Sequence, residues 1–145
     1  MATQWAVPDE GLGEALDTLV KLALTSDQPL QLRLAVNDLV PQRTTVLADY
    51  TEATFAGYSR RTLNRADWQL AFVEENHEAR TILAAGPQLF NPTETGETVY
   101  VVLIVDPGIE VVRYQKRLAT PREVIDGVPF AVNPVITLES KGYEV

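Results

Sequence analysis

The feature that most constrains the fold of this chain is a run of seven consecutive apolar residues within the stretch Thr98–Asp106. Four of the seven are Val and one is Ile, and the run ends at a turn signal, Asp106-Pro107-Gly108. A continuous apolar segment rich in β-branched residues is typical of a strand that is buried on both faces. We therefore expect Thr98–Asp106 to be the central strand, with other elements covering both of its sides.

The remaining sequence predicts one helix followed by strands. Residues 9–24 place apolar side chains on one face at helical spacing, with acidic residues in the first turn. This helix either covers the sheet of its own domain or docks on a partner. Alternating or apolar segments bounded by turn residues predict strands at Leu30–Val36, Tyr58–Leu63, Trp68–Val73, Arg80–Ala85, Thr98–Asp106, Ile109–Leu118 and Phe130–Leu138.

Three details of this prediction can be checked against a structure. Ile109–Leu118 is expected to return from the central strand as a hairpin, with Val112, Tyr114 and Lys116 on one face. Phe130–Leu138 contains Pro134, which cannot donate a ladder hydrogen bond, so this strand should lie at an edge or carry a bulge. The polar segments 74–78 and 120–126 are expected to be connections between strands.

These elements predict a mainly β fold, an antiparallel β-sandwich or flattened barrel of about seven strands with one N-terminal amphipathic α-helix. The length of 145 residues suits one core. The expected organisation is an N-terminal arm over residues 1–8, a single domain over residues 9–138 and a polar C-terminal tail over residues 139–145. No alternation of strands and helices suggests a parallel sheet.

The composition argues against several classes of function. The formal net charge of −8 disfavours nucleic acid as the main partner, because phosphate groups would be repelled. The sequence contains no Cys, so we expect neither a disulfide framework nor a thiolate nucleophile. No apolar run reaches the roughly 18 residues of a membrane-spanning helix, and the start of the chain does not resemble a signal peptide. We therefore expect no membrane partner.

No motif predicts an enzyme. His77 is the only histidine, and it lies among Glu74, Glu75 and Glu78. These four side chains suggest either a solvated acidic loop or a cation site, but a zinc site needs three or four ligands at defined spacing. The glycines are scattered and never cluster as a phosphate-binding loop. We accordingly expect no catalytic residues, no metal and no cofactor.

Two sets of residues are candidates for a protein interface. Trp5, in the N-terminal arm, either folds back on its own core or anchors on a neighbouring subunit. Arg60, Arg61 and Arg65 form a local basic cluster with Tyr58 beside it. This cluster is either a solvated strand edge, protected from wrong pairing by its charge, or a salt-bridging patch for an acidic neighbour.

Several stretches together resemble small virion proteins encoded in the structural gene modules of tailed bacteriophages and prophages. The similarity covers about residues 10–138 and is strongest over Asp49–Tyr58. The matching segments are Leu32-Arg-Leu-Ala-Val-Asn-Asp, Thr44-Thr-Val-Leu-Ala-Asp-Tyr-Thr-Glu-Ala-Thr-Phe-Ala-Gly-Tyr, Leu63, Trp68, Pro87-Gln-Leu-Phe-Asn and the strand that begins Thr98-Val-Tyr.

The resemblance implies a non-enzymatic virion structural protein, with no catalytic residues to carry over. The expected role is capsid decoration, with the major capsid protein and further copies of this chain as partners. The expected location is the capsid surface of the virion, after synthesis in the host cytoplasm. Two alternatives remain open, a tail, tail-tip or receptor-binding fibre component and a small carbohydrate- or ligand-binding β-module.

Overall fold

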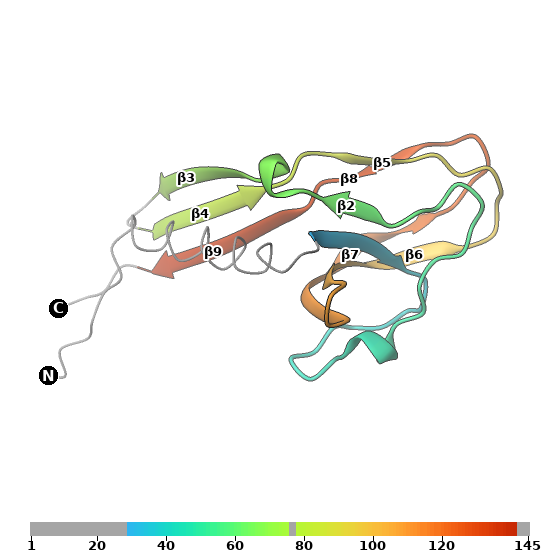
Figure 1. The fold of residues 1–145 in the computed structure, drawn as a ribbon, viewed down its shortest axis with the longest axis horizontal. Coiled ribbons are helices and arrows are strands. Elements are labelled where there is room, and N and C mark those ends of the chain that lie inside the picture. Colours follow the sequence, from blue (N-terminus) through green and yellow to red (C-terminus); the bar gives the residue numbers. More distant parts are fainter. Residues whose placement is uncertain (1–28, 76–77, 142–145) are drawn as a thin grey trace, which may run out of the picture.

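The fold is antiparallel and mainly β, as the sequence predicts. A computed structural model describes residues 29–75 and 78–141 (Figure 1). The described part contains nine strands and two short 3₁₀ helices, so about two more strands than expected. The elements are β1 (Leu30–Ala35), η1 (Leu47–Asp49), β2 (Arg61–Leu63), η2 (Arg65–Asp67), β3 (Gln69–Glu75), β4 (Glu78–Ala84), β5 (Gln88–Phe90), β6 (Thr98–Asp106), β7 (Val111–Glu123), β8 (Phe130–Val132) and β9 (Val135–Lys141).

The nine strands form three sheets. One sheet has four strands in the order β2-β1-β6-β7, a second has three in the order β3-β4-β9, and β5 pairs with β8 as a two-stranded ribbon. Figure 1 shows the three-stranded sheet at one end of an elongated molecule and the four-stranded sheet with the β5–β8 ribbon at the other. All of the pairings between these strands are antiparallel.

The expected central strand is confirmed, with its predicted boundaries. β6 lies between β1 and β7 and is covered on both faces. On one face, Val102 and Ile104 join the main core, which includes Leu32, Leu34 and the aromatic rings of the β5–β8 ribbon. On the other face, Val101, Leu103 and Val105 form a second cluster, with Tyr50 among the partly buried residues that pack on it. Burial on both faces explains why polar residues do not interrupt the run.

The predicted shared face of Val112 and Tyr114 is wrong. The hairpin forms, but its register shifts between Ile104 and Val105: Ile104 pairs with Tyr114 whereas Val105 pairs with Val112. The extra residue, Arg113, is a β-bulge, which interrupts the alternation of side chains between the two faces. As a result Val112 packs on the second cluster and Tyr114 packs on the main core.

The predicted last strand, Phe130–Leu138, is two strands in the structure. Pro134 separates β8 from β9, and the two belong to different sheets. Within the described part, β9 pairs with β4 alone and β8 with β5 alone, so both strands lie at sheet edges, the position expected for the segment that contains the proline. The change of sheet at Asn133-Pro134 connects the two ends of the molecule through one continuous path of chain (Figure 1).

Other boundaries also differ from the prediction. Within the expected strand Tyr58–Leu63, only Arg61–Leu63 pairs with another strand. Tyr58 instead ends a turn, in which its backbone N–H donates to the Phe55 carbonyl. Three residues of the polar segment 74–78, expected to be a connection, belong to strands, since β3 continues to Glu75, which pairs with Glu78 of β4; residues 76–77 lie outside the described part. Polar side chains do not prevent a ladder, because the ladder bonds belong to the backbone. β7 likewise extends to Glu123, into the link expected at 120–126.

Several predictions lie outside the described residues. These are the arm over residues 1–8, the helix over residues 9–24 and the acidic-loop alternatives for His77. Of the expected tail over residues 139–145, the first three residues belong to β9 and the rest lie outside the described part.

Candidate functional site

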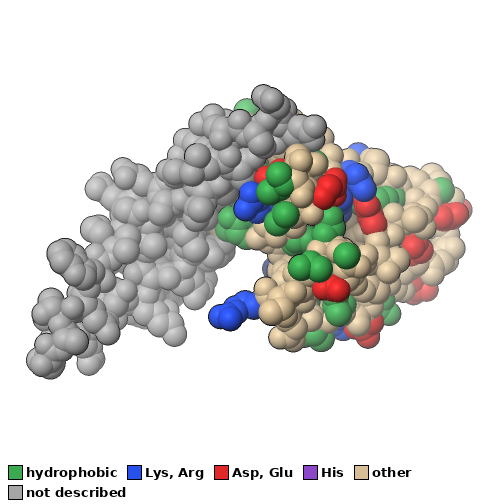
Figure 2. Space-filling view, turned by 60° about the horizontal axis from the view of Figure 1, so that its bottom comes forward, with side chains coloured by type: hydrophobic (Ala, Val, Ile, Leu, Met, Phe, Trp, Pro, Cys, Tyr) green, Lys and Arg blue, Asp and Glu red, His purple; other side chains and the backbone are tan. Residues whose placement is uncertain are grey.

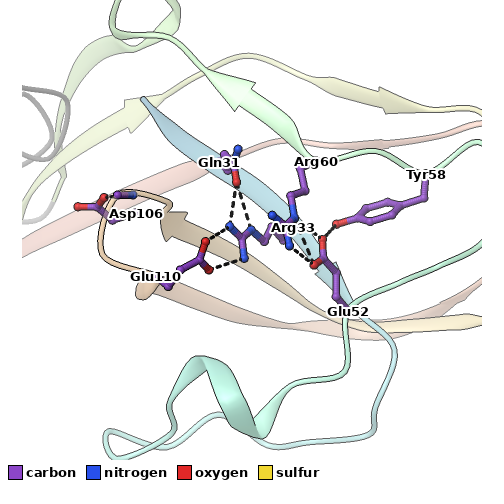
Figure 3. A network of polar contacts seen from close by, with 8 residues as sticks. Gln31, Arg33, Glu52, Tyr58, Arg60, Asp106 and Glu110 are labelled. Atoms are coloured by element: carbon purple, nitrogen blue, oxygen red, sulfur yellow. Dashed lines mark hydrogen bonds and ion pairs between the residues drawn. The ribbon is translucent and has the colours of Figure 1, made fainter. Parts of the chain in front are cut away.

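The segment Asp49–Tyr58 builds the first part of a polar network on the four-stranded sheet (Figure 3). Glu52 forms an isolated bridge with Ala35 of β1, which holds its side chain beside the sheet. The turn from Phe55 to Tyr58 then returns the chain, so that the Tyr58 hydroxyl donates to Glu52 Oε2 at 2.6 Å. Arg60 donates to both carboxylate oxygens of Glu52, from Nη2 at 2.8 Å and from Nε at 2.9 Å. The result is a bidentate Arg60–Glu52 ion pair whose carboxylate also accepts a hydrogen bond from Tyr58.

Arg33 forms the second part of the network and is the most deeply buried charge in it. Its side chain is only 3% exposed. Nη1 and Nη2 donate to the two oxygens of Glu110 at 3.0 and 3.2 Å, and Nη2 also donates to Gln31 Oε1 at 2.9 Å. Because a buried guanidinium needs a counter-charge, Glu110 in the β6–β7 turn effectively ties that turn to β1. Glu110 holds a left-handed backbone conformation, with φ of 51°.

The electrostatics of the network favour the ionised carboxylates. Partial burial opposes ionisation of Glu52, but hydrogen bonds from Arg60 and Tyr58 outweigh it and lower the pKa of this carboxyl. The hydrogen bonds from Arg33 likewise lower the pKa of Glu110. Burial, together with the Glu52 carboxylate, raises the pKa of Tyr58, so this hydroxyl stays protonated and acts as a donor.

The network brings together only part of the residue set predicted from the sequence. Tyr58 and Arg60 meet at Glu52, whereas Arg61 donates to the Leu89 carbonyl at 2.8 Å and lies 5.0 Å from the centre of the Phe90 ring. Arg65 begins η2, and neither its side chain nor Trp5 is among the described groups.

Sequence reasoning missed Gln31, Arg33, Glu52 and Glu110. A signal for Arg33 was present, since a charged residue stands in a strand that pairs with the most apolar segment of the chain. Its partner could not be found this way, because Glu110 is 77 residues away in sequence.

Chemically, the network can hold β1, the Asp49–Tyr58 segment and the β6–β7 turn in place and can expose the charge of Arg60 to solvent. Both carboxylates already accept hydrogen bonds from arginine, and Arg60 remains 46% exposed beside its ion pair. Within residues 29–75 and 78–141, no group of three or more His, Asp or Glu side chains is placed to hold a metal ion. Figure 2 shows acidic and basic side chains interspersed with hydrophobic ones on one face of the described part.

Four of the eight large hydrophobic side chains that are exposed in the described part lie in pairs at the two ends of β7. Ile109 and Val111 lie at the β6–β7 turn, and Ile125 and Val128 lie in the β7–β8 connection. These four side chains are between 41% and 60% exposed. The two ends of β7 pair with the two ends of the nine-residue β6, which spans about 27 Å, so the two pairs can contact different neighbours.

Comparisons with protein-family models, with curated proteins and with solved structures found no match for this chain. Among the described residues, no helix is long and apolar enough to cross a membrane.

Proposed function

We propose that this protein is a non-enzymatic structural component of a bacteriophage virion, which decorates the capsid by binding the major capsid protein lattice and its own copies. The resemblance to small phage virion proteins supports the class of function, and it is strongest over Asp49–Tyr58. In the fold, this segment packs beside β1, buries Phe55 and carries Glu52 and Tyr58 of the polar network.

The observation that carries the proposal is the pair of exposed aliphatic sites at opposite ends of β7. A decoration protein holds adjacent lattice subunits together and therefore needs apolar contacts on more than one side. Two modest contacts joined by a rigid strand act with high effective concentration, because binding at one end places the other near its site. The acidic composition suits a protein present in many copies, since net charge opposes non-specific association.

The proposal keeps the finer architecture expected from the sequence. The antiparallel sheets would form a sandwich or flattened barrel, with the helix over residues 9–24 on one side. Such a small rigid β-domain can bind to the capsid lattice without a change in its own conformation.

Labelling purified virions with an antibody to this chain tests the location. We expect signal over the whole head, and we expect particles lacking the chain to assemble normally but burst at lower temperature. The stabilisation follows from mass action, because the protein binds only the assembled lattice. Signal confined to the tail, with loss of host attachment, would instead support a tail or receptor-binding role. No virion signal, together with binding to a glycan array, would support a carbohydrate-binding module.

Variants at the two ends of β7 test the mode of binding. We expect Ile109→Ser and the double change Ile125→Ser with Val128→Ser each to weaken binding to decoration-free particles by about tenfold or more, because each removes aliphatic contact area. Val46→Ser is a matched control, since Val46 is also exposed but lies in the loop before η1. All variants should retain the melting temperature of the parent. Equal binding by all of them would contradict a contact through the ends of β7.

A further inference from the structure

A groove of about 780 Å³ lies between β7 and the chain that runs from β8 into β9. Its apolar lining comes from the main core: Val102 and Ile104 of β6, Tyr114 and Leu118 of β7, and Phe130 and Val132 of β8 all line it. The Arg122 guanidinium lies 5.8 Å from the centre of the Phe130 ring and so joins the two walls. The groove is therefore an opening at the edge of the main core.

Both walls of the groove are strand edges. Consecutive residues of β7, from Tyr114 to Lys116, line the groove although neighbouring side chains point to opposite faces of a strand. The other wall is also lined by consecutive residues, over β8, the Asn133-Pro134 link and the start of β9. Among the described residues, β7 pairs only with β6, and β8 pairs only with β5. The edges of β7 and β8 that line the groove therefore have no ladder partner within the described part.

The charge around the groove is opposite in sign to that of the whole chain. Lys116 and Arg122 line it, and the other polar lining residues are neutral. The lining residues include neither Asp nor Glu, although the formal net charge of the protein is −8. A positively charged rim around an apolar floor selects for a ligand that combines acidic and apolar groups.

We propose that this groove binds an extended acidic segment of a partner protein, which adds as a strand along β7. In such β-strand addition, backbone hydrogen bonds supply affinity and alternate side chains enter the apolar floor. Lys116 pairs with Val102 and Arg122 pairs with Val99, so both cations lie on the main-core face that lines the groove. The side chains of the segment that enter the groove would therefore include carboxylates beside Lys116 and Arg122 as well as apolar groups on the floor. The bulge opposite Tyr100 and the proline at 121 end the regular part of β7, so the paired segment is short. This inference goes beyond the proposed function, because it assigns a site and a partner chemistry wherever the protein acts.

The test uses the full chain and the fluorescent peptide Glu-Glu-Val-Val-Glu-Glu-Val, in which each face of the strand carries both Glu and Val, and binding is followed by fluorescence anisotropy. A second peptide carries Lys at every Glu position, and a third carries Pro at the central Val. We expect saturable binding of the acidic peptide only, because the second peptide reverses the charge and the third lacks a backbone N–H. We also expect the acidic peptide to slow hydrogen exchange at the amides of β7 that point away from β6. Equal binding of the acidic and basic peptides, or unchanged exchange in β7, would overturn the proposal.

Two charge reversals at exposed positions locate the binding site. Lys116→Glu, on the groove, should weaken binding of the acidic peptide at least tenfold, whereas Arg43→Glu, which does not line the groove, should leave it within about twofold. The two changes alter net charge equally, so they separate a local effect from general repulsion. Equal loss in both variants would show that the peptide responds only to the overall charge. Loss of capsid decoration is not a readout here, so failure of this proposal is distinguishable from failure of the proposed function.

Discussion

Gly57 holds a backbone conformation that the turn at the end of the Asp49–Tyr58 segment requires. It lies in the turn from Phe55 to Tyr58 with φ of +93°, a conformation that side chains with a Cβ rarely adopt. A Cβ built there would lie 2.1 Å from the Asn91 carbonyl oxygen. The glycine therefore permits both the turn and the close approach of the chain at Asn91-Pro92.

Gly57→Ala should lower the free energy of unfolding by about 2 kcal/mol or more, because backbone strain and a backbone clash act together. Gly86→Ala is the matched control: Gly86 also has positive φ, at +81°, but nothing lies within 4 Å of its added Cβ. Urea denaturation of both variants separates the two effects. Equal losses would mean that the contact with Asn91 contributes nothing.

Two other residues, Glu52 and Glu110, should make stability depend on pH. The pKa values of both carboxyl groups are lower in the folded protein than in the unfolded chain. In the unfolded chain, a Glu side chain has its unperturbed pKa of about 4.3. The contribution of each is therefore complete above the unfolded pKa and is lost as pH falls through the folded pKa.

We expect the double variant Glu52→Gln with Glu110→Gln to be less stable than the parent at pH 7 and to approach it near pH 3. Glutamine resembles the protonated acid and lacks the negative charge of the carboxylate at every pH. The parent loses the stabilisation from these two charges only at low pH, where its carboxylates become protonated. Urea midpoints at the two pH values measure the gap. A gap of the same size at both would show that charge is not what these side chains contribute.

At the scale of elements, β6 is the strand that contributes to both clusters of buried side chains. Its two faces belong to two different clusters of buried side chains, and neighbouring residues Leu103 and Ile104 are 1% and 5% exposed. A strand with one solvent-facing side would show burial at alternate positions only. β6 is thus covered by side chains on both of its faces.

Leu103→Ala and Ile104→Ala should each cost about 2–5 kcal/mol, because each leaves a cavity in a packed cluster. Thr62→Ala, at an exposed position of β2 in the same sheet, should change stability by no more than about 0.5 kcal/mol. Urea denaturation of the three variants is the measurement. A mild effect at either buried position would mean that the corresponding face of β6 is not tightly covered.

At the scale of the whole molecule, the chain crosses between sheets at a few points that local sequence only partly indicates. Pro134 predicts an edge strand or a bulge, but it does not indicate which strands β8 and β9 pair with. The pairing of β8 with β5 and of β9 with β4 depends on segments about 40 to 60 residues earlier in the sequence. Those partners are selected by packing, because the backbone of any strand can pair with any other.

The sequence by itself determined the mainly β, antiparallel character of the fold, the central strand with its boundaries and the turn after it. These features follow from local signals, namely β-branched apolar runs and turn residues, whose preferences act over a few neighbouring residues. Only the tertiary structure decided the bulge at Arg113, the division of the last strand and the partners of Arg33 and Glu52. The reason is physical: a register shift moves every following side chain to the other face, and buried charges select partners through space. Neither effect is encoded in the periodicity of a single segment.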